Sequence, residues 1–247
     1  RFSLLALFEA QTRLGPGRKQ LSNPRPLVST GGTSVGWADL LVTDTRDYKP
    51  AGTHRRSIDA QAKKQAQLKQ TIARLADDSY ELLKLRAGAP SNKKFDGFTL
   101  LNECGKRAAG PNVAYTVPDL SDPDTFTLPV EFFTKGWVHV LTESEIAMVM
   151  MCAHKHSSHP KGFRMPGDDR LQLYAVSPPT FETHVLLSKI GVLTVTPDPK
   201  RTAAGKLTPT AALKSGSMKG VLPHFIEFHP DQFEKNAYAT VLDALEP

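Results

Sequence analysis

The order of predicted elements repeats once along this chain, and this repeat constrains the fold more than any other feature of the sequence. Each copy begins with helices that carry apolar residues at helical spacing, continues with a helix that has one polar face, and ends with two strands around a basic loop. Helices that lead into a short hairpin indicate a helix-rich α+β fold. The chain of 247 residues is long enough for two such domains.

The third helix of the first copy, predicted over residues 61–76, has two different faces. Leu68, Ile72 and Leu75 form a stripe that a core can bury. The other face carries long hydrogen-bonding side chains at i, i+4, i+7 and i+11: Lys63, Gln67, Gln70 and Arg74. Arg and Lys pair with guanine edges and Gln pairs with adenine, so this face suits a DNA major groove. A helix that is merely solvated can show the same face, and the neighbouring elements therefore matter.

Those neighbours form a basic hairpin after the helix. The expected elements are helices over residues 2–14 and 35–42 and strands over residues 80–85 and 97–101. The turn between the strands is rich in Gly, Pro, Ser and Asn and carries Lys93 and Lys94. The first copy therefore predicts a hairpin with a cationic tip beside a polar helix.

The second copy begins at Thr142. Together with Glu145, Thr142 forms a capping-box sequence ahead of an apolar helix. A short second helix is expected over residues 168–175. These features reproduce the start of the first copy.

A third helix is expected between Ser177, as its N-cap, and Gly191, at its C-terminal end. Its predicted buried face consists of Phe181, Val185, Leu186 and Ile190. Its predicted exposed face consists of Thr180, Thr183, His184 and Ser188. This exposed face is far less basic than its counterpart in the first copy.

The second hairpin is expected from strands over residues 193–196 and 221–228. The loop between them contains five cations and, from residue 200 onward, no acidic residue. These cations are Lys200, Arg201, Lys206, Lys214 and Lys219. Such a loop could follow a phosphate backbone even if the preceding helix contacts few bases.

In two places the chain resembles the winged helix-turn-helix superfamily. The resemblance rests on AKKQAQLKQTIARLADDSYELLKL and FDGFTLL in the first copy and on DDRLQLYAVSPPTFETHVLLSKIGVLTV in the second. Two winged helices in one chain are similar to plasmid replication initiators, in which both domains bind repeated sites and a dimer represses transcription. They are also similar to multi-domain transcriptional regulators. The resemblance implies a basic winged-helix domain over residues 1–109, a connector containing Pro and Asp over residues 110–130, and a second winged-helix domain with a terminal helix over residues 131–247.

Charge is unevenly distributed along the chain. Residues 1–110 contain 19 Lys and Arg against 10 Asp and Glu, a net charge of +9, whereas residues 111–247 contain 12 against 15, a net charge of −3. A positive excess attracts DNA through counterion release but selects no sequence. The first half is therefore the better candidate for a polyanion-binding domain.

One cluster suggests metal binding instead. Cys152, His154, His156 and His159 are potential zinc ligands within eight residues. On one helix, however, residues 154 and 156 point about 200° apart, and structural zinc sites space their ligands differently. We therefore interpret the cluster as a helix end with a core cysteine and solvated histidines, and predict no metal site.

No catalytic pattern emerges from the remaining residues. The glycines of residues 31–36 lack the Lys-Ser/Thr ending of a phosphate loop, and no nucleophile elbow or carboxylate pair is apparent. A nuclease or nicking activity attached to DNA binding stays open as an alternative. The sequence contains no long apolar run that could span a membrane, and no signal peptide is found at its start. The two cysteines, Cys104 and Cys152, suggest no disulfide framework. These features favour a cytoplasmic protein that does not interact with membranes.

The sequence thus predicts a protein that binds specific double-stranded DNA, is not an enzyme and needs no cofactor. The predicted DNA-binding residues are Arg55, Arg56, Lys63, Lys64, Gln67, Lys69, Gln70, Arg74, Lys93, Lys94, Thr180, Thr183, His184, Lys200 and Arg201. A replication initiator and a transcriptional regulator would use the same contacts. A homodimer and a protein-interaction adaptor, the latter especially for the second domain, remain alternatives.

Overall fold

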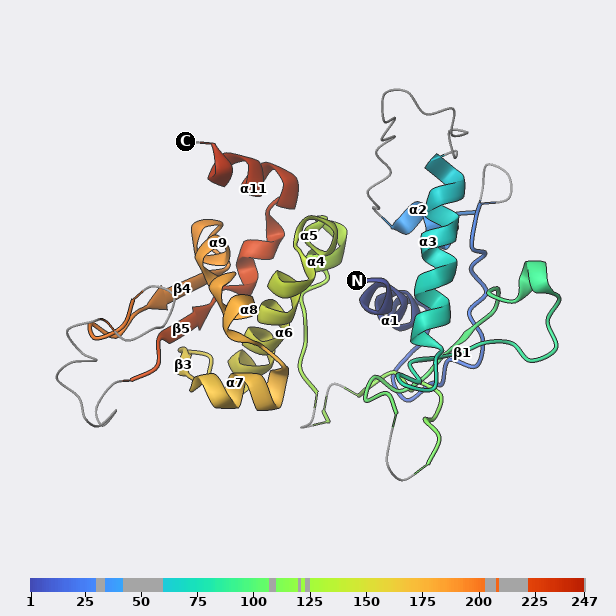
Figure 1. The fold of residues 1–247 in the computed structure, drawn as a ribbon, viewed down its shortest axis with the longest axis horizontal. Coiled ribbons are helices and arrows are strands. Elements are labelled where there is room, and N and C mark those ends of the chain that lie inside the picture. Colours follow the sequence, from blue (N-terminus) through green and yellow to red (C-terminus); the bar gives the residue numbers. More distant parts are fainter. Residues whose placement is uncertain are drawn as a thin grey trace. The chain divides into compact units, whose positions relative to one another are not determined.

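The computed structural model describes residues 1–29, 34–41, 60–106, 110–119, 121–122, 125–202, 208 and 222–246, except for the side chains of Ala60 and Asn92. In this part of the chain, helices predominate over short strands, and the predicted helix-rich α+β class is confirmed. The chain divides into two compact units, Arg1–Leu120 and Ser121–Pro247, and each has its own buried core (Figure 1).

The described part of the first unit combines helices with one hairpin (Figure 1). Its elements are α1 (Phe2–Arg13), α2 (Trp37–Leu40), α3 (Ala60–Leu75), β1 (Leu83–Lys84), the 3-10 helix η1 (Ser91–Lys93) and β2 (Thr99–Leu100). The rings of Phe2, Trp37 and Phe98 pack at centroid distances of 5.2 to 5.9 Å, and all three residues are buried. An aromatic cluster therefore joins α1, α2 and the start of β2.

Several elements of the first unit are shorter than predicted. The third helix agrees with its prediction to within one residue, but the first strand begins only at Leu83 and α2 has a single turn, with Val42 outside the described residues. The chain turns before Leu83 because the Asp77 carboxylate accepts the Ser79 N–H at 2.9 Å. This hydrogen bond lowers the pKa of Asp77 and directs residues 77–80 away from a strand conformation.

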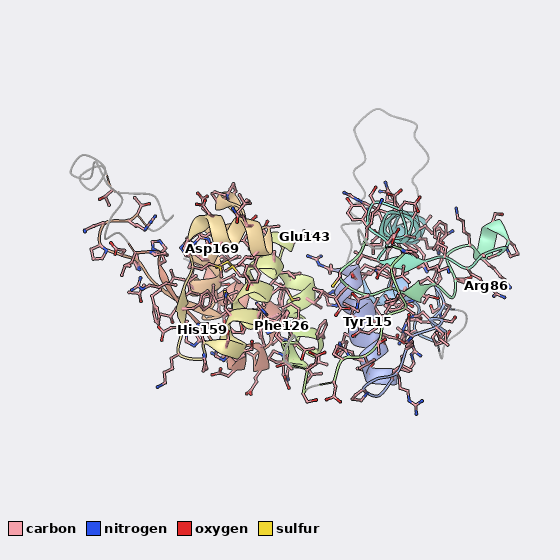
Figure 2. The ribbon with its side chains drawn as sticks, turned by 90° about the horizontal axis from the view of Figure 1, so that it is seen from below. Arg86, Tyr115, Phe126, Glu143, His159 and Asp169 are labelled. Atoms are coloured by element: carbon pink, nitrogen blue, oxygen red, sulfur yellow. The ribbon has the colours of Figure 1, made fainter. Side chains whose placement is uncertain are left out.

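Part of the predicted connector lies within the first unit. The Tyr115 N–H donates to the Leu100 carbonyl, and the Tyr115 carbonyl accepts from the Gln20 N–H, both at 2.9 Å. The Tyr115 side chain, labelled in Figure 2, is buried, and its hydroxyl accepts from Gln11 Nε2 at 2.8 Å. Burial raises the pKa of Tyr115. The segment around Tyr115 therefore links β2 to the chain that follows α1.

The second unit places helices around a three-stranded sheet (Figure 1). Its elements are α4 (Glu131–Thr134), α5 (Trp137–Val140), α6 (Glu143–Ser158), β3 (Phe163–Arg164), α7 (Gly167–Tyr174), α8 (Pro178–Glu182), α9 (His184–Lys189), β4 (Leu193–Thr196), β5 (Phe225–Phe228), the 3-10 helix η2 (Pro230–Glu234) and α11 (Ala237–Leu245). The strand order is β3-β5-β4, and both pairs are antiparallel. The last strand of the unit is therefore the central one.

The capping box at Thr142 is confirmed. The Thr142 hydroxyl accepts the Glu145 N–H at 3.3 Å, and the Glu145 carboxylate accepts the Thr142 N–H at 2.7 Å. These two bonds satisfy backbone donors at the start of α6 that have no partner within the helix. They fix where this buried helix begins.

The helix predicted after Ser177 is interrupted, and its buried face was wrong in part: Phe181 and Ile190 are buried as predicted, but Val185 is not. The Thr183 N–H donates to the Thr180 carbonyl, three residues back, at 3.2 Å, and this tighter turn separates α8 from α9. The phase of the helix shifts, so that the buried positions fall at Phe181, His184, Leu187 and Ile190. Val185, predicted to be buried, is 56% exposed, and His184, predicted to be exposed, is 4% exposed.

The terminal helix is also interrupted. The chain forms η2, leaves the helical conformation at Lys235, and begins α11 with Asn236 as N-cap, whose side chain accepts the Ala239 N–H at 3.0 Å. Phe233 and Ala237 are buried, but Leu242 and Leu245, further along the same apolar segment, are exposed. Part of the apolar face of this segment is therefore not covered within the unit.

Candidate nucleic-acid interface

Helix α3 carries an exposed polar face. Leu68 and Ile72 are buried and attach the helix to the core, and α3 also contacts α2. On the opposite side Gln67, Gln70 and Arg74 are exposed. Lys63, Lys64 and Lys69 are partly exposed. Most of the predicted face is thus accessible, whereas Arg55 and Arg56 lie outside the described residues.

Arg74 differs from the two glutamines because it already has a partner. Its Nη2 donates to the Tyr80 hydroxyl at 3.2 Å, and its guanidinium lies 5.6 Å from the centre of the Tyr80 ring. The hydrogen bond to Tyr80 raises the pKa of Arg74. Arg74 is therefore a permanent positive charge held near the end of α3, with less freedom to reach a ligand than Gln67 or Gln70.

The β1–β2 hairpin adds a group of exposed cations. Lys93 and Lys94 are exposed in and beside η1, in the turn where the sequence places them, and the Lys94 ammonium lies 5.8 Å from the Phe95 ring centre. Lys84 and Arg86, which were not among the predicted contacts, are also exposed (Figure 2 labels Arg86). Their spacing of two residues along an extended segment places them on one side of the chain, a pattern that sequence reasoning could have used.

Lys84 and Arg86 border a groove of about 510 Å³. Its walls come from the segment after α1, from both hairpin strands and from the segment before Tyr115. The lining residues are Leu21, Ser22, Lys84, Leu85, Arg86, Ala87, Gly97, Thr99, Leu101, Asn112 and Ala114. The lining includes no acidic side chain, so the groove adds to the cationic character of the hairpin.

A buried polar network positions the segment that supports this hairpin. The Glu9 carboxylate on α1 accepts from Arg13 at 3.0 and 3.2 Å and from Asn23 Nδ2 at 3.2 Å, and it lies 3.7 Å from Arg25. The Asn23 N–H in turn donates to the Phe98 carbonyl at 2.9 Å. Glu9 thus connects α1 to the chain that borders β2.

In the second unit, the predicted contacts of the third helix serve the fold. Thr180 bonds Ser177, the Thr183 hydroxyl donates to the Thr180 carbonyl at 2.7 Å, and His184 Nδ1 lies 2.6 Å from the Phe181 carbonyl. The exposed residues of α8 and α9 are instead Pro178, Pro179, Glu182, Val185 and Lys189. The prediction that His184 is an exposed contact is wrong, because the turn at Thr183 rotates it into the core.

The base of the loop between β4 and β5 gathers cations. Lys200 is exposed and Arg201 is partly exposed, and Arg201 Nε donates to the Leu222 carbonyl at 2.9 Å. Asp198 accepts the N–H groups of Lys200 at 2.9 Å and Leu222 at 3.2 Å. These bonds lower the pKa of Asp198 and hold the two ends of the loop together. Lys206, Lys214 and Lys219 lie outside the described residues.

Two further arginines approach this loop base, and sequence reasoning missed both. Arg164 on β3 donates to the Pro223 carbonyl and is exposed. Arg170 on α7 stacks its guanidinium 3.5 Å from the Phe181 ring centre. Burial, and next the charge of Arg201, lower the pKa of Arg170. Neither Arg164 nor Arg170 forms an ion pair in the described part of the chain, although the charges of Lys200 and Arg164 also act on Asp198 and help to lower its pKa.

The members of the cysteine and histidine cluster have different neighbours. Cys152 is fully buried, which raises the pKa of its thiol. His154 Nδ1 lies 2.6 Å from the Tyr174 hydroxyl, His156 packs against Phe228, and His159 bonds Ser158. Among the residues that the structure describes, no three His, Cys, Asp or Glu side chains are grouped to hold a metal ion.

No protein-family model, curated protein or solved structure matches this chain. In the described ranges, none of the helices is long and apolar enough to cross a membrane.

Proposed function

We propose that this protein binds specific double-stranded DNA through its first unit and does not catalyse a reaction. The observation that carries the proposal is the exposed polar face of α3 together with the cations of the β1–β2 hairpin in the same compact unit. Either feature alone is common on protein surfaces. Their combination, in a half of the chain with net charge +9, supplies groups that can contact both bases and phosphates.

We further propose that both units are winged helices. The order of elements in the second unit supports this assignment: α6, β3, α7, the α8–α9 pair, β4 and β5, with β5 central in the sheet. The first unit has a related order of three helices followed by a hairpin. In this proposal, the third helix and the hairpin of each unit are the elements that contact DNA.

In the proposed complex, α3 enters the major groove. The stretch from Gln67 to Arg74 rises about 10 Å along the helix, and the groove is about 12 Å wide. Gln67 and Gln70 would contact base edges, because their side chains are exposed and long enough. Lys93 and Lys94 would hold the neighbouring phosphates, and Arg74 would reach the DNA only by leaving or sharing its contact with Tyr80.

The second unit contributes phosphate contacts in this proposal. Arg164, Arg170, Lys200 and Arg201 surround the base of the β4–β5 loop. The α8–α9 face carries Glu182 and Val185 and a single exposed cation, Lys189, so it offers little for reading bases. The same apolar exposure supports a second candidate function for this unit, a protein-interaction adaptor.

The test is selection of bound duplexes from a random library, followed by affinity measurements against salt concentration. Enriched tandem repeats would support a replication initiator, and an enriched inverted repeat would support a dimeric regulator. Gln67→Ala with Gln70→Ala should relax the sequence preference. Lys93→Ala with Lys94→Ala should weaken binding to all sequences and reduce the slope of log affinity against log salt by about 2.

A control pair removes the same charge elsewhere. Lys155→Ala with Lys161→Ala, in the second unit, should leave the salt slope of the selected site unchanged. If both lysine pairs lower the slope equally, net charge rather than the hairpin explains binding. If no duplex binds at low salt, the proposal is wrong and the adaptor function becomes the better candidate.

A further inference from the structure

Helix α11 exposes an apolar stripe. Ala237 is buried and the helix contacts α5, but Tyr238, Leu242 and Leu245 are 69%, 43% and 59% exposed. They occur at i, i+4 and i+7 and therefore lie on one face of the helix. Single exposed apolar residues are ordinary, whereas a continuous stripe along a helix indicates a surface that another helix can cover.

The charged side chains at each end of α11 have the opposite sign to the one that the helix dipole favours there. Asp243 and Glu246 are exposed at its C-terminal end, where the helix dipole favours cations. The N-terminal end lies beside two exposed lysines, Lys235 in the preceding turn and Lys135, whose carbonyl accepts the Ala237 N–H at 3.1 Å. The acidic Glu234 offsets one of these positive charges, and the helix N-terminus adds partial positive charge of its own.

This arrangement is self-complementary. If two copies of α11 pack antiparallel, the acidic end of each lies against the basic end of the other, and the two Leu242 side chains meet near the centre. Tyr238 of one copy then faces Leu245 of the other. A parallel arrangement would place like charges together at both ends. Such a two-fold contact uses the same surface on both subunits.

We propose that α11 is a homodimer interface in which two copies of this chain pair their terminal helices antiparallel. The partner is a second copy rather than an unrelated protein because the stripe and the flanking charges complement themselves. The contact is small, so the dimer is expected to dissociate on dilution. The proposal is independent of DNA binding and is tested without DNA.

Sedimentation velocity of the full chain over a wide range of concentration gives the first test. The wild-type chain should shift from monomer to dimer as concentration rises, and Leu242→Glu should weaken dimerisation at least about tenfold. Leu173→Glu, at a leucine that is 68% exposed on α7, is the matched control and should dimerise like wild type. A chain that stays monomeric throughout, or a Leu242→Glu variant that dimerises normally, would overturn the proposal.

A charge exchange tests the antiparallel geometry. The acid-reversed variant, Asp243→Lys with Glu246→Lys, and the lysine-reversed variant, Lys135→Glu with Lys235→Glu, should each dimerise less than wild type, because like charges then meet at both ends. A parallel pair would not show this loss, because in it like charges meet at both ends in wild type and in each variant. An equimolar mixture should form heterodimers, because opposite charges then meet at both ends. Circular dichroism verifies that both variants are folded. Folded variants that each dimerise like wild type would contradict the antiparallel pairing, and a mixture that stays monomeric would contradict the role of the end charges.

Discussion

Replacing Glu9 with alanine should destabilise the first unit by about 2–3 kcal/mol. The Asn23 amide is buried, and without Glu9 its donor has no acceptor, a cost of about 1–2 kcal/mol. The Arg25 side chain is 26% exposed and loses its carboxylate, which adds about 1 kcal/mol. Arg13 is 34% exposed, so water replaces most of its interaction and it contributes less than about 0.5 kcal/mol.

Urea denaturation followed by tryptophan fluorescence measures this loss. The chain has two tryptophans, of which Trp37 lies in the first unit, so a Trp137→Phe background makes Trp37 the reporter. Arg25 lies 5.6 Å from the Trp37 ring and places the reporter next to the network. Glu103→Ala, at an exposed glutamate of the same unit, should change stability little. A Glu9→Ala effect no larger than that of this control would refute the assigned role of the buried network.

Two further predictions concern the second unit, with Trp137 fluorescence as the readout. Gly191→Ala should lower the free energy of unfolding by about 1–2 kcal/mol, because φ is +79° at this position and an added Cβ would lie 3.2 Å from Gln232. An unchanged unfolding midpoint would contradict the assigned strain. Burial raises the pKa of the Cys152 thiol, so the stability that this neutral thiol contributes is present below the pKa of an unfolded thiol, about 8.5, and is lost as pH rises above it. Wild type should therefore lose more stability than Cys152→Ala between neutral pH and about pH 9.5. In the folded chain, the exposed Cys104 should react with a thiol reagent and the buried Cys152 should not. Equal losses of stability, or rapid reaction of Cys152, would disprove the burial argument.

Local patterns were predictable wherever a few neighbouring residues decide the structure. The capping box of Thr142 and Glu145 fixes the start of α6 through bonds between residues three apart. The stripe of Leu68 and Ile72 similarly identifies α3, because helical periodicity decides which side can be buried. The positions of Lys93 and Lys94 in an exposed turn follow from a turn-forming composition around them.

Contacts between distant residues were not predictable in this way. The Arg170 side chain on α7 reaches Phe181 and the loop base only through the tertiary fold, so nothing in the sequence around this arginine indicated that it joins a cluster. Glu9 was likewise an ordinary helix residue until the fold brought Asn23 and Arg25 to it.

The sequence alone determined the main helices, the capping residues and the uneven charge of the two halves, since these depend on residue type and short spacing. Only the tertiary structure decided which face of a segment is buried where the helical phase is interrupted. His184 and Val185 exchange their expected positions because one tighter turn at Thr183 rotates everything after it. The exposed stripe of α11 also depends on the tertiary structure, because burial depends on what packs against a helix and not on its own periodicity.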